Sequence, residues 1–311
     1  MVRELSKDKI VVLKYAAVSL MLLIFPFAAS RIWLNFAVFI GIYVILTVGL
    51  TLLFGYANQL SFGHAGFFGL GAYASVLGSP YVSVWGGFIL AALLSALVGY
   101  IFGRPILRLR GLSLGLATMA FGQIMSVLFL ELHLTGGAIG LSGIPAPSFG
   151  EFQFDTAVRY YWLVLLVATF VVYLSVRIGD SYIGRALKAI GTNEGAARVA
   201  GVDVESIKAS IFAYSAALAG LAGALYAHYV TFISAGSFRG EFSILVILIV
   251  AVGGRASFLG AILGSILLTI VPQYLREFQQ YAMLLYGVML VVVFMYLPGG
   301  LVGLIRSNEK S

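Results

Sequence analysis

The chain has 311 residues, of which 61% are hydrophobic and only 10% are charged, and its mean hydropathy is +1.04. Such a composition excludes an ordinary soluble domain and indicates a protein that crosses a membrane several times. The formal net charge of +7 predicts no nucleic-acid partner here, because the cations lie mostly at the ends of apolar runs, where they set orientation and meet anionic lipid of the bilayer.

Ten apolar stretches are long enough, or nearly so, to cross a bilayer. Because they are continuous rather than alternating, they predict helices and not barrel strands. They lie at 10–29, 32–54, 56–78, 82–103, 112–132, 160–178, 207–230, 242–257, 259–275 and 280–303. The third is Gly-rich and the eighth is short, so we expect an all-α bundle of about 8–10 transmembrane spans. No linker to a second domain is visible, and residues 1–311 are predicted to form one membrane domain.

The cations predict the orientation of this bundle. One side would carry the N-terminus and most of the cations: Arg104, Arg108, Arg110, Arg177, Arg185, Lys188, Arg198, Lys208, Arg306 and Lys310. The other side would carry few: Arg31, Arg159, Arg239 and Arg276. This asymmetry predicts that both termini are cytoplasmic. The first stretch, which ends in "FPFAAS", shares features with a cleaved signal peptide, but we interpret it as an uncleaved span because many spans follow.

The stretch "GYANQLSFGHAGFFGLGAY" (55–73) combines many glycines with polar side chains at span depth. The glycines allow close helix packing or a broken helix, and unwound backbone is tolerated in a membrane only where protein or a water-filled cavity covers it. We therefore predict that it lines a translocation path and that its polar groups accept the ammonium and carboxylate of a zwitterion: Asn58, Gln59, Ser61 and His64. The alternative is that these groups bond neighbouring helices, with His64 a packing residue rather than a proton carrier.

Two serine motifs follow, and neither predicts catalysis. "GLSLG" (111–115) opens an apolar helix rather than sitting on a strand-to-helix turn. "GLSG" (140–143) resembles an intramembrane protease motif, with His228 as a conceivable base, but "IPAP" after Ser142 ends any helix there. The external loop 133–158 is rich in Gly and Pro, and either receives a binding protein or is a flexible connector.

The stretch "GRALKAIGTNEGAARVAGVD" (184–203) is unusually charged for this chain and falls on the N-terminal side. It predicts a short helix that Thr192 or Asn193 caps and Gly201 ends, with Glu194 at its positive end. Ala196, Ala197 and Ala200 would form a low-relief face that another protein can approach. The pattern alone leaves two interpretations open, a docking site and an interfacial helix whose cations face lipid headgroups.

The later spans carry small residues four apart, Ala216/Gly220/Ala224 and Gly260/Gly264. With Gly63, Gly66 and Gly69 they are predicted to pack helices within the chain, and a contact with a partner permease is the alternative. Arg255 falls at a predicted cytoplasmic turn and is interpreted as a topology anchor.

No energy source is visible in the chain. Its acids fall in loops or near span ends, with Glu131 the nearest to an exception, so coupling through an intramembrane carboxylate is not expected. The sequence has no GxxxxGK[ST] and no Gly-Lys pair, so a partner would have to hydrolyse any nucleotide. The absence of cysteine and the three scattered histidines predict neither thiol chemistry nor a metal site. A channel or secondary carrier that works without ATP stays an alternative.

Residues 194–201 resemble the coupling loop of ABC importer permeases, whose pattern is Glu-Ala-Ala, three residues, Gly. Here Ala196, Ala197 and Gly201 match, while Gly195 follows Glu194 and the acid stands one place early. A similar shift occurs in the branched-chain amino acid permeases of the LivM or BraE type. Five further stretches of this chain resemble motifs of that family and occur in the same order. They are "GLTLLFGYANQLSFGHAGFFGLGAYAS" from 49, "RLRGLSLGLATMAFGQI" from 108, "TGGAIGLSGIP" from 135, "SAALAGLAGALYAHYVTFISAGSF" from 215 and "LPGGLVGL" from 297.

The resemblance covers roughly residues 32–305 and implies a heteromeric importer in the bacterial inner membrane. Its expected partners are a homologous LivH-type permease, two cytoplasmic ATPases that bind ATP and Mg, and a periplasmic protein that delivers leucine, isoleucine or valine. This chain would then hold no cofactor and would dock the ATPases through the coupling loop at about 184–206, at Asn193, Glu194, Gly195, Ala196, Ala197 and Gly201. Related permeases carry urea, short amides or aromatic acids, and the sequence does not choose among these substrates.

Overall fold

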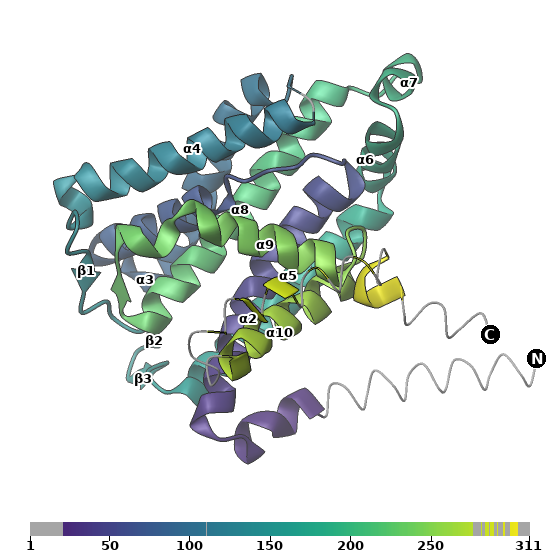
Figure 1. The fold of residues 1–311 in the computed structure, drawn as a ribbon. Helices are drawn as coiled ribbons and strands as arrows, with labels where there is room; N and C mark the ends of the chain where they lie inside the picture. Colours follow the sequence, from purple (N-terminus) through teal and green to yellow (C-terminus); the bar gives the residue numbers. More distant parts are fainter. Residues whose placement is uncertain are drawn as a thin grey trace, which may run out of the picture.

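Helices make up most of the described chain in the computed structural model, as predicted for an all-α membrane protein (Figure 1). The structure describes residues 21–109 and 111–275, and beyond these it describes single positions between 281 and 303. Residues 21–28 are helical, but residues 10–20 of the predicted first span and half of the predicted last span (280–303) lie outside the described residues. So do the cations Arg110, Arg276, Arg306 and Lys310.

The bounds of the α-helices follow the predicted apolar stretches closely. In chain order they are α2 (Arg31–Leu50), α3 (His64–Ile106), α4 (Leu112–Glu131), α5 (Ala157–Asp180), α6 (Tyr182–Thr192), α7 (Glu194–Val199), α8 (Val204–Val230), α9 (Gly240–Gly253) and α10 (Phe258–Leu275). A π-helix, η1 (Thr51–Tyr56), continues α2. Within the described residues, α2 with η1, α3, α4, α5, α8 and α10 are long and apolar enough to cross a membrane. The chain is therefore a multi-pass membrane protein.

α3 contains two of the predicted spans. It has 43 residues, and a straight helix of that length would extend about 65 Å, twice the thickness of a hydrocarbon core. The helix instead bends sharply at Val82 (φ −126°) and Ser83 (φ 63°). The two arms lie antiparallel, since the Ser95 hydroxyl donates to the Phe67 carbonyl oxygen at 3.5 Å. α3 thus forms a helical hairpin.

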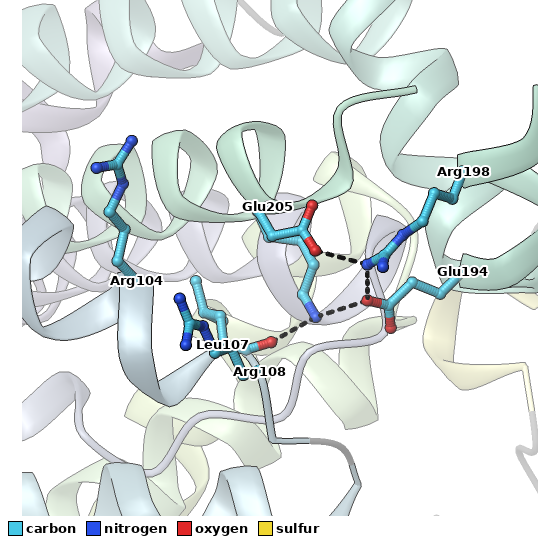
Figure 2. Close-up of a pocket in the computed structure, with 7 residues that line it drawn as sticks. Arg104, Leu107, Arg108, Glu194, Arg198 and Glu205 are labelled. Carbon is cyan, nitrogen blue, oxygen red and sulfur yellow. Dashed lines mark hydrogen bonds and ion pairs between the residues drawn. The ribbon is translucent and has the colours of Figure 1, made fainter. Parts of the chain in front are cut away.

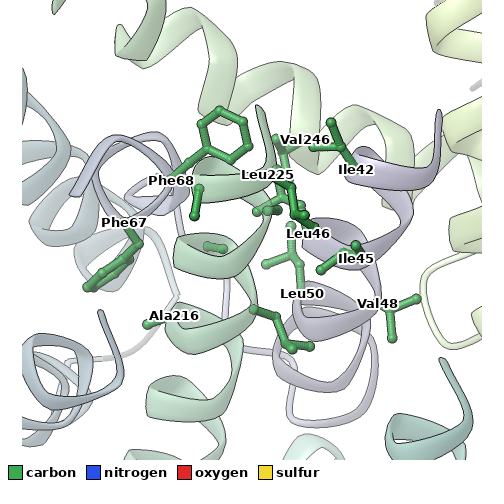
Figure 3. Packing of buried hydrophobic residues seen from close by; sticks show 14 of the residues in the cluster. Ile42, Ile45, Leu46, Val48, Leu50, Phe67, Phe68, Ala216, Leu225 and Val246 are labelled. Carbon is green, nitrogen blue, oxygen red and sulfur yellow. The ribbon is translucent and has the colours of Figure 1, made fainter. Parts of the chain in front are cut away.

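α8 lies at the centre of the described bundle. It packs along α3 and against α2, and its contact with α3 is more extensive than that between any other two elements described. Figure 3 shows side chains from several helices meeting in one apolar cluster, among them Leu46, Phe68, Leu225 and Val246. Because lipid is as apolar as these side chains, tight packing rather than removal from water holds such a cluster together.

The close approach of α8 to α3 requires a glycine at position 220. A Cβ on Gly220 would lie 2.7 Å from the Ala91 carbonyl oxygen and would overlap the Ser95 side chain. Ala216 and Ala224, four residues to either side, are also buried. The other predicted packing glycines face elements of the same chain as well: Gly63 and Gly66 face α4, Gly69 faces α4 and Phe238, and Gly260 and Gly264 face α9. Their contact with a partner permease stays untested.

The loop between α4 and α5 is held in place rather than being a free connector. After the 3₁₀ turn η2 (His133–Thr135), β1 (Leu141–Ser142) pairs antiparallel with β4 (Phe232–Ile233), which follows α8 and precedes the 3₁₀ turn η3 (Ala235–Phe238). β2 (Ser148–Phe149) pairs with β3 (Phe152–Gln153). The ring nitrogens of His228 bond the Pro145 carbonyl oxygen (2.7 Å) and the Ser75 hydroxyl (2.9 Å), so His228 does not serve Ser142 as a base.

The loop with these strands and the charged stretch lie at opposite ends of the bundle. In Figure 1, β1, β2 and β3 lie at the left, while α6 and α7 project at the upper right. Two loops predicted to lie on opposite sides of the membrane are thus far apart, with the long helices between them.

Candidate functional site

The charged stretch 184–203 contains the predicted helix, α7, and also the end of a second helix before it, α6. α6 ends at Thr192 and α7 begins at Glu194, because Asn193 between them has an extended backbone (φ −155°, ψ 105°). The Asn193 side chain accepts a hydrogen bond from the Ala196 amide at 3.1 Å, and it is therefore the N-cap of α7. Thr192, the other predicted cap, belongs to α6 and donates its hydroxyl to the Lys188 carbonyl oxygen (2.9 Å).

The end of α7 agrees with the prediction. The helix stops at Val199, and Gly201 follows with φ +83°. This left-handed backbone strains any residue that has a Cβ, which explains why a glycine ends the helix. The Gly201 amide donates to the Arg198 carbonyl oxygen at 3.0 Å and closes the last turn.

The exposed face of α7 differs from the predicted face. Ala197 is only 4% exposed and packs against Ile190 and Val204, so it supports the helix from within and cannot meet another protein. Gly195, Ala196 and Ala200 are exposed, as expected for an accessible surface. Val199 is 92% exposed. Two residues along a helix rotate by about 200°, so Val199 points away from the side on which Ala197 is buried.

A charged network lies beneath α7 (Figure 2). Lys208 of α8 is 1% exposed, and its ammonium donates to the Leu107 carbonyl oxygen at 2.7 Å and lies 3.5 Å from Glu194 Oε1. Arg198 pairs with Glu205 at 2.6 Å and lies 3.9 Å from Glu194. These residues, with Arg104 and Arg108, line a pocket of about 230 Å³. The sequence analysis placed Lys208 only among the cations on the side of the N-terminus, and the structure adds that this lysine is buried.

α6 touches the end of the first described span. The Lys188 ammonium lies 4.6 Å from the centre of the Tyr56 ring. Gly191 is so close to the Tyr56 carbonyl that a Cβ there would overlap it. Tyr56 is the last residue of η1 and the second residue of the Gly-rich polar stretch 55–73. The fold therefore joins the predicted docking stretch to the predicted path segment, although they are far apart in the sequence.

The broken helix expected from the Gly-rich stretch is present. The chain leaves helical geometry after η1 and re-enters it at His64, so residues 57–63 connect two helices inside the apolar part of the chain. Asn58 has a left-handed backbone (φ 53°), and its side-chain oxygen accepts a hydrogen bond from Arg255 Nη2 at 2.8 Å. The Arg255 guanidinium also lies over the Phe54 ring at 4.1 Å. Arg255 thus contacts the break itself, in addition to any role as a topology anchor.

Side chains from distant helices satisfy the backbone of this break. The Phe62 amide donates to the Thr118 hydroxyl of α4 at 3.0 Å, and the Ala65 amide donates to the Ser243 hydroxyl of α9 at 2.8 Å. Unpaired backbone amides are costly where no water reaches them, so these hydroxyls make an unwound segment possible here.

The predicted path residues differ in their accessibility. Asn58 is exposed, whereas Gln59 is 8% and Ser61 and His64 are 1% exposed. His64 Nδ1 lies 3.2 Å from Ser61 Oγ, and His64 Nε2 lies 2.8 Å from Ser215 Oγ on α8. Gln59 Nε2 donates to the Ala57 carbonyl oxygen at 3.0 Å, and Gln59 Oε1 has no hydrogen-bond partner among the described residues. The surrounding helices therefore cover Gln59, Ser61 and His64.

A larger pocket elsewhere does not suit a zwitterion. About 510 Å³ lies between α2, α5 and α10, with walls formed almost entirely by apolar side chains such as Phe36, Ile40 and Leu165. Such walls offer no group to hold an ammonium or a carboxylate, and they fit contact with lipid.

Four residues of these sites were missed by the sequence analysis: Val199, Lys208, Thr118 and Ser243. Val199 had one visible signal, because it is the bulkiest apolar residue between the predicted cap Asn193 and Gly201. Thr118 and Ser243 look like ordinary hydroxyls of membrane helices, and only the fold shows which amides they accept from.

Comparison with known proteins supplies the family. A family model described as a branched-chain amino acid transport system permease component matches residues 32–294. The chain belongs to this family. This permease is 33% identical to the high-affinity branched-chain amino acid transport system permease protein LivM of Salmonella typhimurium (strain LT2), over 92% of the chain and 73% of the relative. Its identity to the LivM protein of Escherichia coli (strain K12) is 34% over the same shares.

A second group of relatives is more distant. The permease is 23% identical to LivH of Salmonella typhimurium (strain LT2), over 84% of the chain and 91% of LivH. The transport systems in these relatives' names thus contain two homologous permeases, and this chain is more similar to LivM. No solved structure matches the permease.

Proposed function

We propose that this permease is a membrane subunit of an ATP-binding-cassette importer that carries leucine, isoleucine or valine across the bacterial inner membrane. The observation that carries the proposal is the family match over residues 32–294, joined by 33% and 34% identity to two proteins named LivM. On this proposal the chain forms one membrane domain, with both termini in the cytoplasm as its cations predict.

The proposed complex places the energy source in other chains. A LivH-type permease completes the membrane part, two ATPases bind and hydrolyse ATP with Mg, and a periplasmic protein delivers the amino acid. This chain contributes no catalytic residue. ATP binding closes the ATPase pair and moves α6 and α7, and the bundle then changes from an outward-facing to an inward-facing state.

The ATPase contacts the exposed side of α7 on this proposal. Val199 is its apolar anchor, because a valine that is 92% exposed at the tip of a projecting element gains most from burial in a partner. Gly195 and Ala196 allow close approach beside it, and Asn193 and Gly201 define the two ends of the helix. Ala197 holds the helix against Ile190 and Val204.

The broken segment 57–63 borders the proposed path. Its polar groups become accessible when α3 and α8, which pack closely on each other, move together away from α4. Gln59 Oε1 is then an acceptor for the substrate ammonium, while Asn58, Ser61 and His64 provide donors for the carboxylate.

Uptake into proteoliposomes tests the proposal. The vesicles contain this permease, its partner permease, the ATPases and the binding protein, and labelled leucine and urea are offered separately. We expect leucine uptake that needs ATP and disappears when the ATPases are omitted. Urea uptake without leucine uptake would overturn the proposed substrate but keep the mechanism, and uptake through this chain alone would overturn the importer.

A further inference from the structure

One buried ammonium connects three helices beneath the docking surface. Lys208 belongs to α8, and it donates to the carbonyl oxygen of Leu107, directly after the end of α3 (2.7 Å). The same ammonium lies 3.5 Å from the carboxylate of Glu194, the first residue of α7. Dashed lines in Figure 2 mark both contacts, one at the Leu107 carbonyl and one at the Glu194 carboxylate. A single side chain therefore holds the end of α3, the start of α7 and α8 together.

Because Lys208 is buried, its contacts with Leu107 and Glu194 are costly to break. The Lys208 side chain is 2% exposed, and a buried ammonium is tolerated only while its partners compensate for the lost water. The last carbonyls of a helix lack partners in the helix and carry its negative end, which makes Leu107 a suitable acceptor. α7 cannot move away from α3 and α8 without separating these charged groups. The neighbouring pair Arg198–Glu205 is 55% and 64% exposed, so water replaces its contacts easily.

The two long helices joined by Lys208 also hold the broken segment. His64, the first residue of α3, bonds Ser215 of α8 at 2.8 Å. α3 and α8 share the most extensive contact among the described elements, so they move together. A displacement of α7 that Lys208 passes to this pair therefore reaches residues 57–63.

We propose that Lys208 is a positioning residue that transmits the movement of α7 to α3 and α8. This inference rests on the proposed function, because it assumes that an ATPase moves α7. Lys208 itself is buried beneath α7 and does not touch the ATPase. A second route exists in the contact between α6 and Tyr56, so the experiment has to separate the two.

The test compares Lys208→Met with the wild type in the complete complex in proteoliposomes. Three quantities are measured: capture of the ATPases, ATP hydrolysis and leucine taken up per ATP hydrolysed. We expect capture and hydrolysis to persist while leucine per ATP falls about tenfold, a size typical of coupling between two sites. Lys208→Arg keeps the cation and restores most of the ratio. Arg177→Met is the matched control, because it removes an exposed cation of α5 that bonds the Tyr173 hydroxyl and lies outside both the coupling loop and α6.

A wild-type ratio in Lys208→Met overturns the inference and assigns transmission to the contact between α6 and Tyr56. If Lys208→Met does not assemble, Lys208→Gln replaces it, since the amide still donates toward Leu107 but has no charge to hold Glu194. A wild-type ratio in that variant overturns the inference equally. If the proposed substrate is wrong, the result is distinguishable, because the wild-type complex then takes up no leucine. The ratio of solute taken up to ATP hydrolysed is in that case measured with the solute that the complex does carry.

Discussion

Two breaks between helices lie close to each other in this permease, and they are built in opposite ways. At Asn193 a single exposed residue separates α6 from α7, and its own side chain caps the helix that follows. At 57–63 the break is seven residues long and mostly buried, and its flanking amides are satisfied by Thr118 and Ser243 from two other helices. An exposed break can rely on water and one local side chain, whereas a buried one needs partners that the rest of the fold supplies.

The difference also divides the proposed roles. The exposed break sets the direction of a short helix whose outer face is open to a partner protein. The buried break puts polar groups between helices, where they are reached only after those helices move. On the proposed function, docking depends on the local geometry of one cap, whereas the path depends on several distant residues together.

The largest effect on stability is expected from Thr118→Val combined with Ser243→Ala. Each change leaves a buried amide without its acceptor, and each orphaned group costs about 1–3 kcal/mol. The free energy of unfolding of the purified permease pair should fall by about 2–6 kcal/mol, because the sites lie on different helices and their effects add. Thermal unfolding in detergent measures the change. Thr192→Val, which alters an exposed hydroxyl at the other break, serves as control, and equal shifts for the two variants would contradict the comparison.

Val199→Asp should weaken ATPase binding without affecting the fold. Placing a charge at the centre of a contact costs about 2 kcal/mol or more, which corresponds to a roughly thirtyfold loss of affinity. Capture of the ATPases by the immobilised permease pair measures it. Val199→Ala shortens the side chain without adding charge and should reduce capture less. Full capture by Val199→Asp would remove Val199 from the docking face.

Asn193→Ala should loosen α7 alone. Loss of an N-cap side chain costs about 1 kcal/mol, and here it frees the Ala196 amide. Hydrogen exchange of that amide should accelerate about fivefold, while exchange in α3 and α8 stays the same. Asn193→Asp keeps the acceptor and should exchange at the original rate. Faster exchange spread over α8 would mean that the cap stabilises more than its own helix.

The smallest effect is expected from Arg255→Gln. The guanidinium bonds Asn58 and covers the Phe54 ring, but both contacts lie at the exposed edge of the buried break. Exposed contacts of this kind contribute about 0.5–1 kcal/mol. Thermal unfolding should therefore shift slightly, and uptake should persist. A shift as large as that of the Thr118→Val and Ser243→Ala pair would show that Arg255 holds the break together.

Local chemistry was enough to predict several parts of this permease. Continuous apolar runs predicted membrane helices, since backbone groups in lipid must bond within their own segment. Asn193 and Gly201 predicted the two ends of α7, because a capping side chain and a left-handed glycine act on their immediate neighbours. The glycines in the stretch 55–73 allowed either close helix packing or a broken helix, and a break is present at 57–63.

Tertiary structure alone decided which side of each element is used. Ala197 and Val199 lie on the same short helix, and no periodicity over six residues distinguishes the face that packs on Ile190 and Val204 from the face left open. Lys208 was one of many cations predicted on the side of the N-terminus, and only the fold placed Leu107 and Glu194 around it. Thr118 and Ser243 are 56 and 178 residues from the amides they accept from, so their roles depend on helix packing and not on local sequence. Helix ends are set by neighbouring residues in the chain, whereas burial and pairing are set by neighbours in space.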